Sequence, residues 1–197
     1  MNDKSYELLF SNFSRHIPIG PGEKTFLEQL FTHRLISRKQ FLHRVPETGH
    51  HTAFVTSGCL RSYSIDRNGT EHIYQFAPPG WWIADIQSVI TGAPGTMNID
   101  AITDSAVLLL HRSDQEKLFS RFPKFERFFR IIMEKSLAAN SNRLLDYMCM
   151  TAQERYFAFF ERYPDLSATI PQKHIAAYIG VTPEFLSKLR AELVKKG

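Results

Sequence analysis

The stretch QKHIAAYIGVTPEFLSKLRA, residues 172–191, decides the fold of the C-terminal part of the chain. It predicts two short helices joined by a tight turn at Gly180, because glycine readily adopts the left-handed backbone that such a turn needs. Thr182 suits the N-cap of the second helix and Pro183 its first position. Apolar or small residues occupy the places where the two helices must pack: Ile175, Ala176, Ile179, Val181, Leu186, Leu189 and Leu193. We therefore predict a helix-turn-helix.

The polar residues left on the second helix suit a DNA major groove. Glu184 can accept from cytosine N4, Lys188 can donate to guanine, and Ser187 can do either. Four further side chains are better placed for phosphates: Gln172, Lys173, Thr182 and Arg190. One alternative is a helical hairpin used only for packing. Another is that Glu184 and Lys188, four residues apart, form a surface ion pair, which is compatible with DNA reading because it could exist in the unbound protein.

A long helix is predicted immediately upstream. Residues 124–150 contain neither glycine nor proline, Pro123 suits the first turn, and the segment would be about 40 Å long. We expect part of it to pack on the preceding domain and part to pair with its copy in a second subunit. A helix packed wholly within its own chain is the alternative. The capping-box pattern Thr151 to Glu154 then begins another helix, which ends near Tyr163.

Short segments rich in β-branched and aromatic residues, separated by turn signals, fill the region from about residue 32 to residue 112. The strongest hairpin signal is the turn at residues 66–69, with Asn68 followed by Gly69. Many short strands at even spacing predict an antiparallel barrel or jelly roll with room for one ligand. Helices are expected before it, at 5–16 and 22–31, and after it, from a capping box at Ser113 to about residue 121.

The fold class is thus α+β, and we expect three parts. Residues 1–120 would form the β-barrel sensor domain, 121–150 the long dimerisation helix, and 151–197 the (winged) helix-turn-helix domain. Any wing must come from residues 164–171, because the chain ends soon after the second helix.

Charge is unevenly distributed along the chain. Residues 1–120 carry a net charge of −1 and residues 121–197 a net charge of +5, which suits a nucleic-acid partner, although a solvated face would explain it as well. Cys59 and Cys149 form no CxxC unit, and both are expected to be buried small hydrophobic residues. We find neither a secretory signal nor a membrane span, and expect a cytoplasmic protein.

In this order, barrel, long helix and helix-turn-helix resemble the Crp/Fnr superfamily of bacterial transcription regulators. The stretches that carry the resemblance are 57–61 with Asn68-Gly69, Pro79-Gly80, 101–105, and above all 171–193. The resemblance implies a homodimer that binds a two-fold related DNA site and alters the recruitment of RNA polymerase, with a small-molecule effector in the barrel.

The sequence departs from the members of that family that bind cyclic nucleotides. In those members, a Gly-Glu after the Pro-Gly-Asp turn and an Arg-Ser/Thr pair grip the ribose and the phosphate. Here residues 81–85 read WWIAD, Gly95-Thr96 stands in place of the pair, and no arginine lies between residues 68 and 111. We therefore expect that cyclic AMP is not the effector. The candidate effector pocket, holding an apolar effector or filled by its own side chains, comprises Trp81, Trp82, Ile83, Asp85 and Thr96.

Two other classes of function compete with a DNA-binding regulator. One is a cupin-like metal-binding barrel or enzyme with an accessory helical domain, suggested by histidines such as His43, His50, His51 and His72, although the His-x-His spacing of cupins is missing. The other is a dimer that binds a protein partner through its C-terminal helices. No catalytic motif stands out, so we expect no enzyme, no cofactor and no bound metal.

Overall fold

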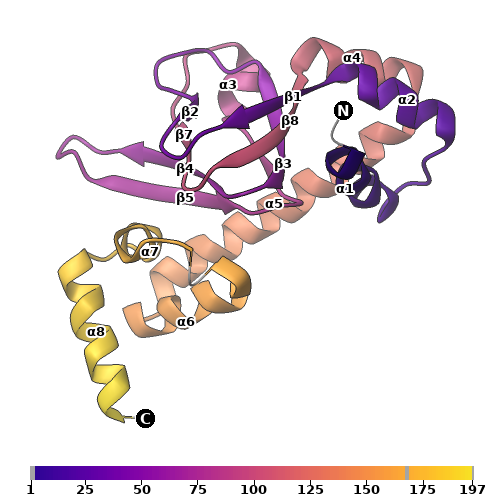
Figure 1. The fold of residues 1–197 in the computed structure, drawn as a ribbon. Coiled ribbons are helices and arrows are strands. Elements are labelled where there is room, and N and C mark those ends of the chain that lie inside the picture. The colour runs from indigo at the N-terminus through magenta and orange to yellow at the C-terminus, as the bar shows by residue number, and fades with distance from the viewer. Residues whose placement is uncertain (1–2, 167–168, 197) are drawn as a thin grey trace. The chain divides into compact units, whose positions relative to one another are not determined.

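Strand β8 (Ser105–His111) organises the N-terminal part of the computed structural model, which describes residues 3–166 and 169–196 (Figure 1). It pairs antiparallel with β1 (Phe31–Ile36) on one side and with β3 (His51–Ser57) on the other. Val107 and Leu109 belong to one hydrophobic cluster, while Leu108 and Leu110 belong to another. Successive side chains of a strand point to opposite faces, so β8 is covered on both faces, which explains its unbroken apolar run.

Two four-stranded sheets form the predicted jelly roll. Their orders are β1-β8-β3-β6 and β2-β7-β4-β5. The remaining strands are β2 (Phe41–His43), β4 (Leu60–Ile65), β5 (Glu71–Ala77), β6 (Trp82–Ile83) and β7 (Asn98–Ala101). Val55, Leu60, Ile99 and Val107 are almost fully buried in the cluster to which both sheets contribute. The α+β fold class is confirmed.

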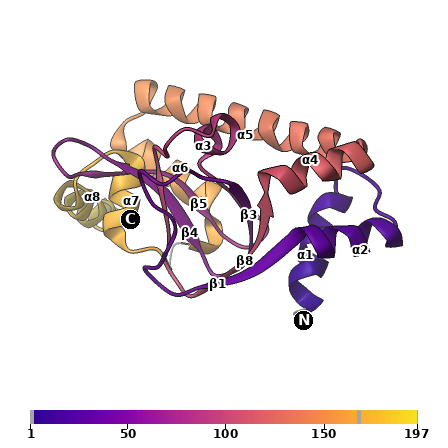
Figure 2. The same cartoon turned by 90° about the horizontal axis from the view of Figure 1, so that it is seen from above.

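Helices cover the other face of β8. They are α1 (Asp3–Ser14), α2 (Pro21–Leu30), α4 (Arg112–Arg121) and the beginning of α5 (Lys124–Cys149), and Figures 1 and 2 show the first three gathered together. Aromatic rings fill this layer: the ring centroids of Phe13 and Phe128 are 4.3 Å apart, and those of Phe54 and Trp82 are 5.0 Å apart. Both predicted N-terminal helices are present, with their ends shifted by one or two residues.

The start of α4 differs from the prediction. The N-cap is His111, whose Nδ1 accepts from the Ser113 amide at 3.1 Å, so Ser113 does not cap the helix. The reason is that β8 runs directly into α4, which places the last strand residue at the cap. The structure also contains a short helix that the sequence analysis missed, α3 (Ile86–Thr91), capped by Asp85.

The hairpin between β4 and β5 is built as its sequence predicts. Gly69 has a φ of 81°, and Oδ1 of Asp66 accepts from the amides of Asn68 and Thr70 at 2.8 and 3.0 Å. This side chain therefore fixes the turn with two hydrogen bonds to the backbone.

The chain divides into two compact units, residues 1–64 with 75–135, and residues 65–74 with 136–197. The predicted domain boundaries at 120 and 150 stay predictions. None of the described helices is both long and apolar enough to span a bilayer.

The second unit is helical apart from the hairpin tip. After the second half of α5 come α6 (Ala152–Arg162), η1 (Pro164–Leu166), α7 (Gln172–Ile179) and α8 (Pro183–Lys196). The predicted capping box at Thr151 and Glu154 is present at the start of α6. In the segment expected to supply a wing, residues 164–166 form a 3-10 helix and residues 167–168 lie outside the described part, so its described residues contain no strand.

Two glycines allow a test of how tightly the roll is packed. Gly58 and Gly80 both have positive φ, but a Cβ on Gly58 would lie 2.3 Å from the Asp104 carbonyl oxygen, whereas one on Gly80 would meet nothing within 4 Å. We expect Gly80→Ala to cost about 1–2 kcal/mol of unfolding free energy for the backbone conformation alone. Gly58→Ala should cost about 1–3 kcal/mol more from the clash. Urea unfolding of both variants checks this, and equal midpoints would contradict it.

Candidate functional site

Helices α7 and α8 meet at a tight turn. Gly180 adopts the left-handed conformation (φ 73°, ψ 41°), and its amide donates to the Ala176 carbonyl. The Val181 amide donates to the same oxygen at 3.0 Å. Thr182 Oγ1 accepts from the Phe185 amide at 3.2 Å, so Thr182 caps α8 and Pro183 is its first residue, as predicted.

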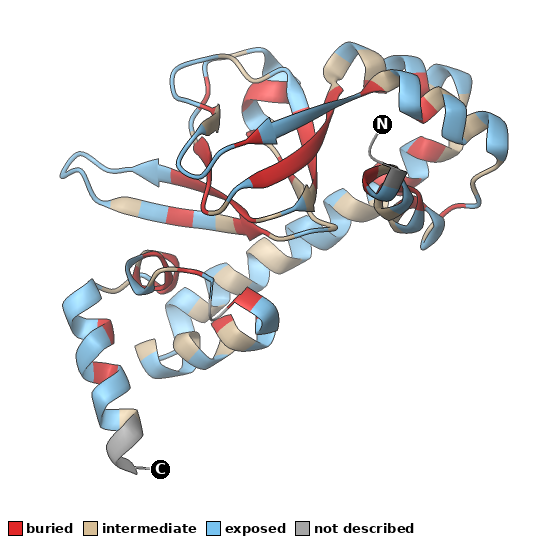
Figure 3. Cartoon of the chain, viewed as in Figure 1, coloured by how far each residue is buried: buried red, intermediate tan, exposed pale blue. Residues whose placement is uncertain are grey.

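One face of this helix pair is buried within its own unit. Ile175, Ala176, Ile179, Leu186 and Leu189 are at most 9% exposed. They were predicted to pack from their spacing, and the structure confirms it (Figure 3). Val181 and Leu193, which were predicted to pack with them, are only partly buried. The opposite face of α8 is therefore left to solvent.

All seven residues predicted to contact DNA lie on exposed positions. They are Gln172, Lys173, Thr182, Glu184, Ser187, Lys188 and Arg190. In the described part of the chain, Glu184 and Lys188 form no ion pair, so both side chains are available to a partner. Phe185 is 49% exposed beside them, and the sequence analysis assigned it no role because only polar residues of this helix were considered for DNA contact. Apolar side chains of this kind can contact the thymine methyl group.

Side chains of the long helix α5 contact the turn between α7 and α8. Arg143 of α5 donates from Nη2 to the Tyr178 carbonyl at 2.9 Å, and its guanidinium carbon lies 4.0 Å from the centre of the Tyr178 ring. The Tyr147 hydroxyl donates to the same carbonyl oxygen. A Cβ on Gly180 would lie 2.6 Å from the Tyr147 ring. Glycine is therefore required here for close packing as well as for its backbone conformation.

The same arginine holds the hairpin tip. Arg143 donates to the carbonyl oxygens of Ile73, at 2.6 Å, and of Tyr74. Glu71 Oε2 lies 3.8 Å from Nδ1 of His174 on α7. Within the second unit, Arg143 of the long helix therefore forms hydrogen bonds both to the hairpin tip and to the end of α7 beside the turn. No sequence pattern predicted this arrangement.

A cavity of about 110 Å³ lies in the first unit. Side chains of the roll form part of its wall: Leu42, His43, Ile83, Asp85, Ile99 and Leu109. Residues 47–51, with Arg34 of β1, complete the lining. The cavity is therefore partly apolar, with charged and imidazole groups at several positions.

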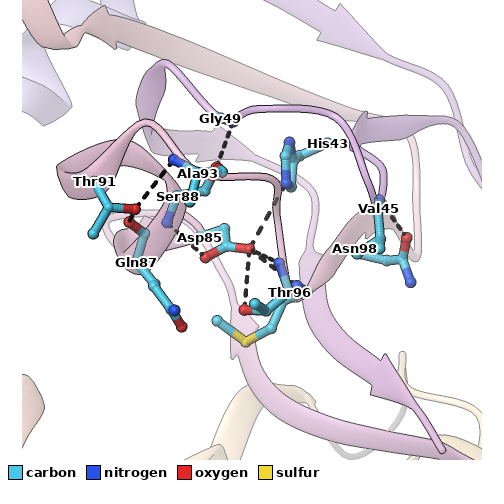
Figure 4. A network of polar contacts seen from close by, with 11 residues as sticks. His43, Val45, Gly49, Asp85, Gln87, Ser88, Thr91, Ala93, Thr96 and Asn98 are labelled. Atoms are coloured by element: carbon cyan, nitrogen blue, oxygen red, sulfur yellow. Dashed lines mark hydrogen bonds and ion pairs between the residues drawn. The ribbon is translucent and has the colours of Figure 1, made fainter.

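Asp85 is a buried carboxylate that accepts several of the hydrogen bonds beside this cavity (Figure 4). The residue is 2% exposed, and its carboxylate accepts hydrogen bonds from three backbone amides, those of Ser88 at 3.2 Å, Thr96 at 2.6 Å and Met97 at 3.0 Å. His43 Nε2 lies 3.8 Å away. Burial by itself would raise the pKa of Asp85, but these amides and His43 together hold that pKa below its usual value.

The five residues of the predicted effector pocket are only partly brought together. Ile83 and Asp85 line the cavity, and Thr96 bonds to Asp85. The Trp82 ring instead packs among phenylalanines, with Nε1 donating to Asn12 Oδ1 at 3.1 Å, and Trp81 packs against the core between the sheets. Neither tryptophan lines the cavity.

The region around Thr96 does not fit a cyclic phosphate. The amides of Thr96 and Met97 are already bonded to a carboxylate that stays ionised at neutral pH. A phosphate at this point would meet a like charge, and no arginine between residues 68 and 111 is present to offset it.

Histidines and cysteines are the remaining residues that could bind a metal ion or act as a nucleophile. Within the described residues, no group of three His, Cys, Asp or Glu side chains is arranged to hold a metal ion. Burial raises the pKa of the Cys59 thiol to about 12, so it stays protonated, consistent with the expected small hydrophobic role. Cys149 is exposed, which corrects the expectation that both are buried.

The chain is similar to a known protein family and to known bacterial proteins. Residues 33–122 match the family described as "Cyclic nucleotide-binding domain". The chain is 26% identical over 160 residues to the "Regulatory protein HlyX" of Actinobacillus pleuropneumoniae, covering 73% of this chain and 63% of that protein. It is 24% identical over 173 residues to the "Anaerobic regulatory protein" of Haemophilus influenzae, covering 82% and 66%. The chain therefore spans slightly less than two thirds of the length of these relatives.

A solved structure supports the fold. The structure of FixK2 from Bradyrhizobium japonicum superimposes with a TM-score of 0.74 at 22% identity, covering 85% of this chain and 86% of that one. A jelly roll of the cyclic nucleotide-binding type, followed by a long helix and a helix-turn-helix, defines the class. Residues 33–122 match the cyclic nucleotide-binding domain, and the chain is similar to bacterial regulatory proteins, in line with the resemblance to the Crp/Fnr superfamily that its sequence indicated.

The Asp85 network makes a stability prediction. In Asp85→Asn the NH2 group must face either the Ser88 amide or the Thr96 and Met97 amides, all of which are donors, and we expect a loss of about 2–4 kcal/mol at pH 7. Because the folded pKa of Asp85 is lowered, its contribution is present above the unfolded pKa of about 3.9 and is lost as pH falls toward the folded pKa. Urea unfolding at pH 7 and pH 3 should therefore show the difference between native and variant shrinking.

The matched control is Asp66→Asn, which changes a carboxylate that also accepts two backbone amides, but at an exposed turn. It should have a much smaller effect. Equal losses in the two variants would contradict the role given to burial at Asp85.

Proposed function

We propose that the chain is a cytoplasmic, sequence-specific DNA-binding transcription regulator that acts as a homodimer and reads the major groove with α8. The observation that carries this is the face of α8: a capped helix, buried on one side, that presents Glu184, Phe185, Ser187 and Lys188 to solvent on the other. The names of the relatives, regulatory proteins of bacteria, support it.

Base and phosphate contacts would divide along the helix pair. Glu184 would accept from cytosine, Lys188 would donate to guanine, and Ser187 would contact either. Gln172 and Lys173, at the start of α7, and Thr182 and Arg190 would bind phosphates on either side of the groove. The excess of positive charge after residue 120 supports attraction to DNA.

An apolar row on α5 supports the homodimer. Met133, Leu137, Leu144 and Met148 are 41, 68, 63 and 74% exposed, and their spacings of four, seven and four residues put them on one side of the helix. Surfaces of this kind mark a partner when they are contiguous. Two copies of α5 would cover each other's row and set two α8 helices toward a two-fold related site.

Binding of the dimer to DNA would regulate transcription. We propose that the dimer changes RNA polymerase recruitment and that an effector other than cyclic AMP acts on the jelly roll. The ionised Asp85 beside Thr96, together with the missing arginine, supports the exclusion of a cyclic phosphate.

Replacing Leu144 by glutamate should break the dimer. A carboxylate at the centre of the row would be desolvated in the pair, so we expect the dimer dissociation constant to rise by roughly two orders of magnitude or more. Sedimentation velocity measures it. Leu35→Glu is the matched control, because Leu35 is a 71% exposed leucine on β1, away from the row. A dimer that survives Leu144→Glu unchanged would rule out this seam.

Selection from a random duplex pool at a fixed, stated salt concentration tests DNA reading. The native chain should enrich an inverted repeat, while Glu184→Ala/Lys188→Ala should lose the base preference at defined positions, at about 1–3 kcal/mol per lost contact. The control is Arg130→Ala/Glu134→Ala, which removes an exposed pair of opposite charges with the same spacing from α5. It should enrich the native repeat. If the native chain enriches no sequence, the proposal of a sequence-specific reader fails.

A further inference from the structure

Three arginines line one small cavity of the second unit. The cavity, of about 40 Å³, lies between α5, α6 and α7, and Arg143, Arg155 and Arg162 line it with a single acidic residue, Asp146. Its charged lining therefore carries a net charge of +2. None of these residues belongs to the α8 face that is proposed to read DNA.

The arginines converge without an acidic partner. The guanidinium carbons of Arg143 and Arg155 lie 5.4 and 5.3 Å from the centre of the same Tyr147 ring. In the described part of the chain, neither they nor Arg162 form an ion pair with a carboxylate. Like charges that line one cavity repel one another, and an anion bound in the cavity would relieve that repulsion.

The donors of the three side chains are unequally used. Arg143 bonds to backbone carbonyls, and Arg155 donates from Nε to the Ile179 carbonyl at 2.9 Å and from Nη1 to the Met150 carbonyl at 2.7 Å. In the described part of the chain, Arg162 contacts the Tyr163 ring but makes no hydrogen bond, and its buried Nε, like the Nε of Arg143, has no partner. Buried guanidinium nitrogens are normally hydrogen-bonded, and of the three arginines Arg162 has the most donors left for an acceptor.

We propose that this cavity binds a phosphate-type oxyanion, held by Arg162 and by the remaining Nη2 group of Arg155. Guanidinium forks match the oxygens of phosphate in geometry and charge. A cavity of about 40 Å³ has room for a small group such as one phosphate. The group is either a free phosphate or a phosphate of the DNA backbone. Because Arg155 also holds the Ile179 carbonyl beside the turn, the anion would lie against the segment that positions α8.

Calorimetric titration of the full chain with inorganic phosphate, in the absence of DNA, is the first arm of the test. Arg162→Gln should weaken binding roughly ten-fold or more, because a charge-assisted contact is lost. Asp146→Asn should strengthen it, because the one opposing charge is removed. Arg130→Gln changes an exposed arginine of the other unit and should leave it unchanged. A far-ultraviolet circular dichroism spectrum and a melting curve of Arg162→Gln establish that the variant is folded.

Salt dependence of DNA binding is the second arm and separates the two sources. If the cavity takes a backbone phosphate, Arg162→Gln lowers the slope of log affinity against log salt by about one. If it takes a free oxyanion, the slope stays native while phosphate binding is lost. The proposal is overturned if both arms fail. In the first arm, the native chain would bind no phosphate, or would bind it as tightly as Arg162→Gln does; in the second arm, the salt slope of DNA binding would be the same for both chains. The phosphate arm uses no DNA, so its result does not depend on whether the chain reads DNA.

Discussion

The burial of β8 on both of its faces is the constraint on which the first unit depends. Val107 and Leu109 face the other sheet of the roll, while Leu108 and Leu110 face the helices and the rings of Phe13 and Phe128. A strand with one solvent-exposed face would leave the N-terminal helices and the beginning of α5 without a surface to pack on. The aromatic layer, the position of Trp82 and the attachment of the long helix all follow from this two-sided packing.

In the second unit, the comparable role belongs to Arg143. Its guanidinium bonds to carbonyl oxygens of the hairpin tip and of Tyr178, one residue from the end of α7. Carbonyls at a helix C-terminus have no partner within the helix, so a cation there is favourable both as a donor and for the helix dipole. Because the turn is supported from the side of α5, the outward face of α8 needs no internal contacts and stays available to a ligand.

Asp85 determines the electrostatic character of the region around Thr96. Its carboxylate bonds to the amides of Thr96 and Met97 and caps α3, so the protein itself supplies the negative charge at this point. An internal anion with a lowered pKa is an effective barrier to an external one, since both compete for the same donors. The match to the cyclic nucleotide-binding domain describes the fold of the roll, and the exclusion of a cyclic phosphate remains part of the proposed function.

The sequence by itself determined the local elements: the turn at Gly180 with its Thr182 cap, the Asn68-Gly69 hairpin, the Thr151 capping box and the long helix. Each depends on neighbouring residues, through backbone conformation, capping and periodicity, and is readable without knowledge of distant contacts. Only the tertiary structure decided what brings distant residues together: the direction of the Trp82 ring, the closing of Asp85 on Thr96, and the three arginines around one cavity. The hydrogen bonds of Trp82 and Asp85 join residues that are 70 and 11 positions apart, and the energies of such contacts depend on burial and geometry that no local pattern records.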